Sequence, residues 1–441
     1  MAKVPARVIV VGAGFSGLLS AVHLLRGSAD VAVVLVERRD AFGPGTAYDT
    51  GNADHLLNVR LGNMSAFPEE PDHLSVWLAQ QPSWQASSAF ITRGTYGAYL
   101  RDLLGQAIAD NPGRLTLERG AATDLEPVGD GWRLHLADGR TIDGDAVILA
   151  IGNQEPSTPP GVDEALRGSR LYVENPWSGR SEVPEDARQV LLIGTGLTAV
   201  DVAIALQRPG RTVTALSRHG LLPRAHATVA TPAADLSFSG SPAEVLRQAR
   251  QAAAERDWRE VFDALRHRAI GLWRSWEQLE RLQFIRHLRP MWEVHRHRLA
   301  PTIANNIASL IAEGALVVVS GKLGALTLDG HAVDVTYRPR GRRRVLRRRF
   351  DAVVNCTGPL GRISESREPL IVNLLRRGLA EPDPLGLGFR VDGDGVLQVG
   401  VEQPRNLHVV GPLGRGAFWE MTSVPDLRGQ AQVVATRVLG G

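Results

Sequence analysis

The chain has 441 residues, of which 44% are hydrophobic and 22% charged, a composition typical of a soluble globular protein with roughly two or three domains. Its 50 lysines and arginines nearly balance 47 aspartates and glutamates, for a formal net charge of +3, which argues against a general nucleic-acid binder. No apolar run reaches the roughly 18–20 residues of a membrane span. We expect no signal peptide, because a strand pattern begins almost at the N-terminus. The single cysteine, Cys356, excludes an internal disulfide and favours a reducing, cytoplasmic location.

A strand, a glycine-rich turn, a helix and a second strand follow one another over residues 7–37. The first strand, "RVIVVGAG", is continuously apolar, as in a parallel strand buried on both faces. The turn carries the G-x-G-x-x-G spacing with Gly12, Gly14 and Gly17, and Glu37 ends the second strand. These glycines let the backbone approach a pyrophosphate at the helix N-terminus, and Glu37 can accept hydrogen bonds from ribose hydroxyls. The pattern predicts a dinucleotide site.

The same pattern returns in "VLLIGTGLTAVDVAIAL" (190–206), where Gly194, Gly196 and Ala199 take the three small-residue positions. The strand that follows ends in Ser217-Arg218-His219, with no acid where Glu37 would be. A carboxylate there would repel a 2′-phosphate, whereas an arginine pairs with it through charge-assisted hydrogen bonds. We therefore expect NADPH rather than NADH at this second site. The alternative is that Arg218 is merely a solvated strand-end residue.

A third repetition concerns the segments after each glycine turn. Residues 131–156 and 331–361 each read as a hairpin and then an apolar strand, which ends in Ala150-Ile151-Gly152 and in Cys356-Thr357-Gly358. The predicted fold class is α/β, with two Rossmann-type dinucleotide-binding domains. Each has three layers and a parallel sheet closed by a β-meander insertion. The C-terminal "NLHVVGPLGRG" and "DLRGQAQVVATRVL" return as a strand and a helix of the first domain.

Residues of about 241–313 have a different, helix-forming texture, with apolar residues at three- and four-residue spacings. Ser241 and Glu244 form a capping box in sequence. We interpret this stretch as a helical insertion, in which Trp273 and Trp276 are expected in the core. The predicted domains are residues 1–160 (FAD-binding, first part), 161–360 (NAD(P)H-binding, with the insertion) and 361–441 (FAD-binding, C-terminal part).

One basic run, "RPRGRRRVLRRRF" (338–350), lies between two strand-like segments. Arginines on both sides of a glycine turn indicate an exposed hairpin. An anion-binding or partner-binding surface is the alternative.

Two nucleotide sites, one with a ribose acid and one with an arginine, suggest a flavin together with a reduced nicotinamide. The chain resembles a bacterial family of FAD/NAD(P)-binding flavoproteins and is similar to class B flavin monooxygenases of the N-hydroxylating type. Besides the two glycine turns, the resemblance is carried by "HLLNVRLGNMSAFP", "ITRGTYGAYL", "LAIGNQEP", "SRHGLLPRAH", "RHLRPMWEVHRHRLAP", "NCTGP" and "GRGAFWEMTSVPDLRGQA". The Baeyer–Villiger fingerprint F-x-G-x-x-x-H-x-x-x-W is missing between the turns, where the chain reads "VENPWSGRSEVPED".

The resemblance implies where the cofactors bind. It places Asn58 as a polar contact and Met64 as a packing contact beside the isoalloxazine, and Arg93 over the flavin or pyrophosphate. The positive end of a helix that begins near 422–426 would face the flavin and stabilise its reduced, anionic form. The expected FAD contacts are Gly12, Gly14, Ser16, Gly17, Glu37, Arg38, Asn58, Met64, Arg93, Gly152 and Gly411. The expected NADPH contacts are Gly194, Gly196, Thr198, Ser217 and Arg218.

Candidates for the catalytic side are Asn58, Trp419 and Glu420, with Trp419 as a wall against the flavin and Glu420 as a contact for an amine or for the flavin edge. Arg224 and His226 are candidates for the nicotinamide side or the substrate. The basic stretch 286–298 either binds an anionic group of the substrate or is a charged helix face paired with nearby acids. We expect no metal site, since His295 and His297 do not share a helix face.

Three functions stay open. In a monooxygenase, NADPH reduces FAD, O₂ forms a C4a-hydroperoxyflavin, and oxygen passes to a small amine-bearing or anionic substrate. An FAD-dependent dehydrogenase would instead reduce a quinone or small acceptor, and a sensor would bind nucleotide without turnover. A disulfide reductase needs a cysteine pair, which a chain with Cys356 alone does not have. The expected partners are therefore a small-molecule substrate and O₂, with no nucleic acid and an open oligomeric state.

Overall fold

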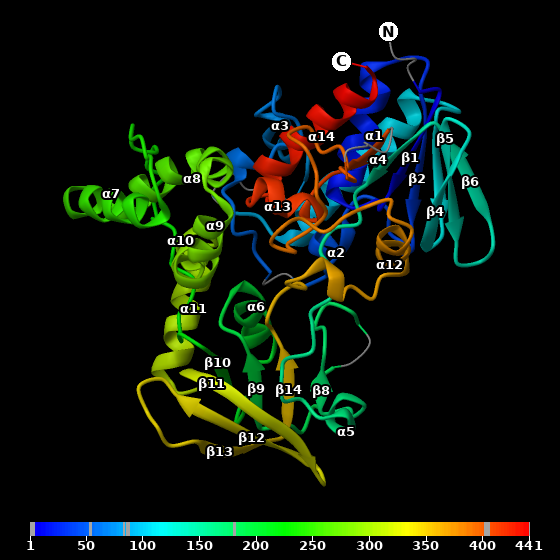
Figure 1. The fold of residues 1–441 in the computed structure, drawn as a ribbon. Coiled ribbons are helices and arrows are strands. Elements are labelled where there is room, and N and C mark those ends of the chain that lie inside the picture. Colours follow the sequence, from blue (N-terminus) through cyan, green and yellow to red (C-terminus); the bar gives the residue numbers. More distant parts are fainter. Residues whose placement is uncertain are drawn as a thin grey trace. The chain divides into compact units, whose positions relative to one another are not determined.

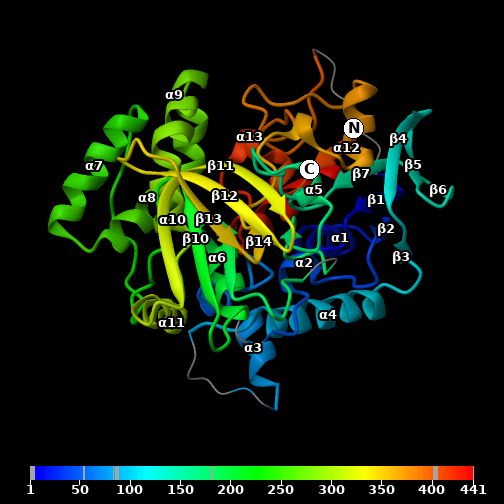
Figure 2. The same ribbon diagram turned by 90° about the horizontal axis from the view of Figure 1, so that it is seen from below.

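The computed structural model describes residues 5–52, 55–82, 84, 89–179, 182–400 and 406–440. The chain forms two compact units, drawn in Figures 1 and 2. Unit 1 consists of Met1–Gln154, Ala269–Gln278 and Gly361–Gly441, and unit 2 of Glu155–Arg268 and Leu279–Leu360. Within the described ranges, no helix is long and apolar enough to cross a membrane.

Unit 1 is built on a five-stranded parallel sheet with the strand order β15-β7-β1-β2-β3. Its central strands are buried on both faces because helices pack on one side and a small antiparallel sheet on the other. Helices α1 and α14, from opposite ends of the chain, pack against each other on the first side. The elements are β1 (Arg7–Val11), α1 (Phe15–Gly27), β2 (Ala32–Glu37), α2 (Gly45–Tyr48), α3 (His73–Ala79), α4 (Arg93–Asp110), β3 (Leu115–Arg119), β7 (Ala146–Leu149), β15 (Leu407–Val409), α13 (Arg415–Phe418) and α14 (Val424–Val438).

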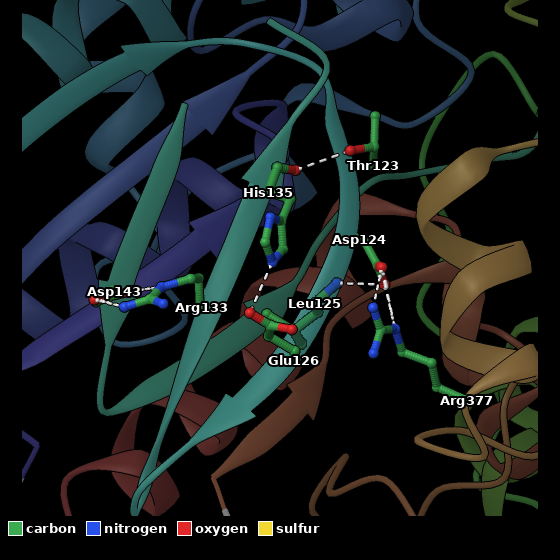
Figure 3. Close-up of polar contacts among 8 residues, drawn as sticks. All are labelled: Thr123, Asp124, Leu125, Glu126, Arg133, His135, Asp143 and Arg377. Atoms are coloured by element: carbon green, nitrogen blue, oxygen red, sulfur yellow. Dashed lines mark hydrogen bonds and ion pairs between the residues drawn. The ribbon is translucent and has the colours of Figure 1, made fainter. Parts of the chain in front are cut away.

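The antiparallel sheet of unit 1 fixes the returning C-terminal segment to the N-terminal domain. It comprises β4 (Ala122–Val128), β5 (Gly131–Leu136) and β6 (Thr141–Gly144), and α12 (Pro369–Arg376) packs on β4. Figure 3 shows the polar contact that closes this junction: the Arg377 guanidinium donates to both Asp124 oxygens, with Nε 3.0 Å from Oδ1 and Nη2 2.6 Å from Oδ2. Burial raises the pKa of Asp124, but hydrogen bonds from Arg377 and from the Leu125 N–H outweigh it and lower the pKa overall.

Unit 2 contains a seven-stranded sheet with the order β13-β12-β11-β10-β9-β14-β8. The long strand β11 pairs in parallel with β10 at its start and antiparallel with β12 further on. In unit 1 these two pairings belong to separate strands, since β3 extends the parallel sheet and β4 starts the antiparallel one. The predicted meander insertions are present in both units. The elements are α5 (Glu164–Arg167), β8 (Tyr172–Val173), β9 (Gln189–Ile193), α6 (Leu197–Ala205), β10 (Thr212–Ser217), β11 (Leu316–Asp329), β12 (Ala332–Pro339), β13 (Leu346–Phe350) and β14 (Ala352–Asn355).

The predicted helical segment is α7 (Pro242–Glu255), α8 (Trp258–Ser275), α9 (Gln278–Gln283), a π-helical turn (Phe284–Leu288), α10 (Arg289–Arg296) and α11 (Pro301–Ala312). Ser241 and Glu244 form the expected capping box at α7. Trp273 and Trp276 are buried, as predicted, with 1% and 7% of their surface exposed. Residues 269–278 group with unit 1, so this part of the helical segment belongs to unit 1 rather than to unit 2.

We expect a pH-dependent loss of stability from His408 on β15, a buried histidine whose ring nitrogens find no hydrogen-bond partner among the described residues. Burial lowers its pKa from 6.5 to about 4. Above pH 6.5 the imidazole is neutral in both states. Below pH 6.5, the imidazole binds a proton in the unfolded chain but stays neutral in the folded one. The free energy of unfolding therefore falls by about 3 kcal/mol in all between pH 6.5 and 4.

The measurement is the melting temperature at pH 7.5 and at pH 5 for the wild type and for His408→Leu. The variant should lose less stability between the two pH values, because leucine fills the site without titrating. An exposed histidine, His331, provides the control His331→Gln, which should keep the wild-type pH dependence. Equal pH dependence of His408→Leu and the wild type would contradict the prediction.

Candidate functional site

The first glycine turn is packed so closely that it excludes side chains. Gly12 has φ +96°, and a Cβ there would lie 2.5 Å from the Ala150 carbonyl oxygen; a Cβ on Gly17 would lie 1.7 Å from the Gly12 oxygen. Helix α1 begins after Gly14 with no side-chain cap and no acidic residue in its first turn. Its first N–H groups and the positive end of its dipole are therefore available to an anion.

Glu37 lies at this turn, as predicted for a ribose-binding acid. It is buried, and its Oε2 accepts a hydrogen bond from the Ala13 N–H at 3.0 Å. Its Oε1 accepts from the Arg39 N–H at 3.1 Å and lies 3.3 Å from Arg39 Nε. The neighbouring Arg38 is exposed and forms a 2.7 Å ion pair with Glu368. The carboxylate of Glu37 is thus oriented by hydrogen bonds from the turn and from Arg39, whereas Arg38 forms its ion pair with the residue directly before α12.

The second glycine turn repeats this geometry in unit 2. Gly194 has φ +127°, and a Cβ there would lie 2.3 Å from the Cys356 carbonyl oxygen, which corresponds to the Gly12–Ala150 contact. Helix α6 begins after Gly196, again with no side-chain cap and no acidic residue in the first turn. A Cβ on Gly196 would meet nothing within 4 Å, so this glycine leaves open space in front of the helix.

The two turns differ at the end of their second strands. The Gly194 N–H donates to the Leu216 carbonyl at 2.8 Å, just as the first glycine turn donates to the residue before Glu37. Ser217 therefore occupies in unit 2 the position that Glu37 occupies in unit 1. Its hydroxyl lies 2.9 Å from that of Thr195, so a neutral pair replaces the carboxylate. Next along the chain, Arg218 is exposed. The acid of unit 1 is thus replaced by a serine at the equivalent place, whereas Arg218 corresponds to Arg38, which pairs with Glu368 in unit 1.

The predicted flavin-side residues come together in unit 1 through backbone pairing. Residues 55–57 run antiparallel to residues 91–93, with the Leu57 N–H donating to the Ile91 carbonyl and the Arg93 N–H to the His55 carbonyl, both at 2.8 Å. This places Asn58 and the start of α4, where Arg93 lies, at adjacent positions. Asn58 and Arg93 are half-buried, and Met64 is buried in the core of the same unit.

Gly411 lies where α1 and α14 meet. Its φ is +92°, and a Cβ there would be 3.5 Å from Ser16 Oγ. Its N–H donates to Gln430 Oε1 on α14 at 2.8 Å. The other strand-end glycine, Gly152, has φ +73° and open space around its Cβ position. Small residues thus surround the point where the two helix N-termini of unit 1 approach the sheet.

Trp419 has an unusual backbone conformation. It is buried, and its φ of +48° is rare for a residue with a side chain. Trp273 from α8 stacks on it, with ring centroids 4.8 Å apart and an interplanar angle of 26°. The Trp273 Nε1–H donates to the Gly416 carbonyl at 2.8 Å. Glu420, also buried, follows Trp419 and precedes Ser423, the N-cap of α14.

The sequence analysis assigned Trp273 to the core but missed this contact with Trp419. Only the apolar spacing of α8 marked the residue, and such spacing does not identify a distant partner. The missed role is therefore structural support for the turn that carries Trp419 and Glu420.

The basic stretch of unit 2 is largely paired. Arg298 is buried and donates to both oxygens of Asp263, at 2.8 and 3.1 Å. Arg289 and His297 both contact Glu293, at 3.3 and 2.9 Å. The described geometry therefore agrees better with the charged-face interpretation of these residues than with an anion site. The segment containing Arg224 and His226 pairs by backbone hydrogen bonds with residues 294–299. In the part of the chain that the structure describes, no three His, Cys, Asp or Glu side chains gather as metal ligands would.

Comparison with known proteins agrees with this geometry. Residues 9–154 match the family described as FAD-NAD(P)-binding. YdhS, an uncharacterized protein of Escherichia coli (strain K12), is 25% identical over 218 residues, which are 45% of this chain and 39% of that protein. The chain spans only about two fifths of the length of the curated relatives it matches, 39% and 38%.

Two solved structures share the fold over nearly the whole chain. The ornithine N-hydroxylase of Kutzneria sp. 744 has a TM-score of 0.65 and 16% identity, covering 98% of both chains. The cadaverine monooxygenase DfoA of Erwinia amylovora, solved with FAD, has a TM-score of 0.68 and 13% identity, covering 100% of this chain and 95% of that one. The predicted α/β fold and the FAD/NAD(P)-binding character of the N-terminal domain are confirmed. The roles of individual site residues stay predictions.

The open space at Gly196 gives a sharp test of the second site. Gly196→Ala should fold with an unchanged melting temperature, since the new methyl group meets no protein atom within 4 Å. It should weaken NADP⁺ binding about tenfold or more, because the methyl group lies where a pyrophosphate would approach the backbone. Isothermal titration calorimetry measures the affinity.

Gly105→Ala, another position with open space around the added Cβ, is the matched control and should leave NADP⁺ affinity unchanged. Gly17→Ala should instead destabilise unit 1, since its Cβ overlaps the Gly12 oxygen. A folded Gly196→Ala protein with wild-type NADP⁺ affinity would refute the assignment of this turn.

Proposed function

We propose that the protein is an FAD- and NADPH-dependent monooxygenase that oxygenates a small molecule bearing an amine or an anionic group. The observation that carries the proposal is the pair of glycine turns with different chemistry at one equivalent position, which is Glu37 in unit 1 and Ser217 in unit 2. The arginine that follows is paired with Glu368 in unit 1 (Arg38), whereas Arg218 of unit 2 forms no ion pair among the described residues. An acid suits the free ribose hydroxyls of FAD, and a neutral residue followed by a cation suits the 2′-phosphate of NADPH.

The residues present fit both cofactors. Each turn offers an uncapped helix N-terminus without a first-turn acid, which suits a pyrophosphate. In unit 2 the space in front of Gly196 is open to backbone approach. In unit 1, the paired segments that carry Asn58 and Arg93 supply polar groups for a flavin ring. FAD, when bound, would supply hydride acceptance from NADPH and the reaction with O₂.

The protein's own contribution would be binding, orientation and exclusion of water. The buried stack of Trp273 on Trp419 would provide a dry, rigid wall. Helix α14 would direct its positive end at the flavin, although Asp426 in its first turn offsets part of that field. The buried Glu420 is our candidate for holding an amine, and Arg224 and His226 for contacting the nicotinamide or a substrate anion.

The substrate class is supported by likeness alone. Two of the solved structures that share the fold are an ornithine N-hydroxylase and a cadaverine monooxygenase, both named for small amines. Their low sequence identity carries the fold and leaves the substrate of this chain as part of the proposal. Cys356 argues against a disulfide reductase, because it is the chain's single cysteine and burial raises the pKa of its thiol.

The test is to reduce the FAD-loaded protein anaerobically with NADPH and mix it with O₂ while recording flavin spectra. A transient species distinct from both reduced and oxidised flavin is expected. It should decay faster when ornithine, lysine or cadaverine is present, with one hydroxylated product formed per NADPH consumed. The product is identified by mass spectrometry.

Other outcomes distinguish the alternatives. Direct return to oxidised flavin, together with fast reduction of a quinone, would indicate a dehydrogenase and overturn the monooxygenase. A purified protein that carries no flavin and does not bind added FAD would overturn both enzymes in favour of a nucleotide sensor.

A further inference from the structure

Three residues from separate strands form a row at the carboxyl end of β10 in unit 2. Ser217 on β10 is the register partner of Ser320 on β11. The N–H of Arg340, just past the end of β12, donates to the Ser320 carbonyl at 2.9 Å. Adjacent strands lie about 4.8 Å apart, so Arg340 begins about 10 Å from Ser217, a gap that an arginine side chain and a bound phosphate fill together. Arg340, in the arginine-rich hairpin (residues 338–350), thus lies in the same row as Ser217, at the strand end beside the second glycine turn.

The next side-chain pair on the same face of β11 and β12 consists of two more cations. Lys322 on β11 is the register partner of Arg338 on β12, and both are exposed. Because side chains alternate along a strand, Lys322 shares a face with Ser320, and Arg338 shares a face with Arg340. Like charges placed directly opposite each other destabilise a sheet. Their retention at this edge is consistent with a field that attracts an anion.

The electrostatic surroundings of His219 indicate that Arg340 and Arg218 lie near the same position. Burial lowers the pKa of His219, and the guanidinium groups of Arg340 and then Arg218 lower it further. Arg218 comes from the end of β10 and Arg340 from the hairpin, so two elements far apart in sequence direct positive charge at one position.

These cations lack the acidic partners that other arginines have. Within the described residues, neither Arg218 nor Arg340 forms an ion pair, whereas Arg347 on the same hairpin pairs with Asp334. The equivalent hairpin of unit 1 is charge-balanced: Arg140 contacts Glu118 and Asp138, both at 2.8 Å. Among the described residues of the two equivalent hairpins, the one in unit 2 therefore carries arginines without acidic partners, and Arg140 in the unit 1 hairpin is paired.

We infer that Arg340, together with Arg218 and the hydroxyl of Ser217, forms a binding site for a phosphate monoester dianion, and that its ligand is the 2′-phosphate of NADPH. The arginine-rich hairpin is then a specificity-determining element for NADPH over NADH. The inference rests on the proposed function for the identity of the nucleotide. It goes further by assigning recognition to a hairpin more than a hundred residues beyond the glycine turn.

Binding of nucleotide fragments to the full chain tests the inference without any turnover. Wild-type protein should bind adenosine 2′,5′-bisphosphate more tightly than 5′-AMP. Arg340→Gln should lower the affinity for the bisphosphate about tenfold, the loss typical of one hydrogen bond to a charged group, and leave 5′-AMP affinity unchanged. Arg348→Gln removes one exposed charge from the edge strand of the same hairpin and should change neither affinity.

Each failure has a distinct meaning. If wild-type protein does not favour the bisphosphate, NADPH preference itself is wrong, and the proposed function falls with it on that point. If wild-type protein discriminates but Arg340→Gln discriminates equally, only the assignment of the hairpin is overturned. Competition by inorganic phosphate at concentrations similar to the bisphosphate would show a general anion site instead of nucleotide recognition. Melting temperatures of both variants, expected at the wild-type value, exclude a folding defect.

Steady-state kinetics gives a second readout. Arg340→Gln should raise the KM for NADPH about tenfold with little change in kcat, and should leave the KM for NADH unchanged, since NADH has no 2′-phosphate to lose. A fall in kcat with both nucleotides would point to a structural effect and contradict the inference.

Discussion

Direct contact between backbone atoms at the two glycine turns is the constraint on which the rest of this structure depends. In each unit, a strand-end carbonyl lies where the Cβ of the first turn glycine would be: Ala150 against Gly12, and Cys356 against Gly194. Contacts this short admit no side chain, so the central strand, the helix after it and the strand beside it are locked together. The same geometry leaves the first N–H groups of α1 and α6 without side-chain caps, and these groups are the natural partners of a pyrophosphate.

Around this shared frame, the units differ by charge rather than by fold. Unit 1 places the buried carboxylate of Glu37 at the turn and balances the arginines of its meander hairpin with acids. Unit 2 places a serine there, follows it with Arg218 and carries a hairpin whose first arginine has no acidic partner in the described chain. A carboxylate favours hydroxyl groups and disfavours phosphates, and unpaired guanidinium groups do the reverse. In the function proposed above, charge at a few strand ends would be sufficient to give two similar units different nucleotides.

Unit 1 is closed by segments that are remote in sequence. Helix α14 packs on α1, Arg377 pairs with Asp124, and Trp273 supports the turn at Trp419. Each contact joins the N-terminal domain, the helical segment or the C-terminal return to another of these parts. A positive φ at the buried Trp419 is tolerated only because its surroundings hold it, through the ring stack and the hydrogen bond to Gly416.

The sequence by itself determined the elements whose causes are local. The glycine spacing, the apolar strands, the capping box at Ser241 and the two meander insertions all follow from short-range sterics and periodicity, and the structure has them. The exchange of Glu37 for Ser217 and Arg218 was also predictable, because it depends on counting from a glycine turn to a strand end. Only the tertiary structure brought Trp273 to Trp419 and Arg340 to the row containing Ser217. These placements depend on strand register and helix packing between segments far apart in the chain, and no local pattern encodes which distant residue will lie opposite.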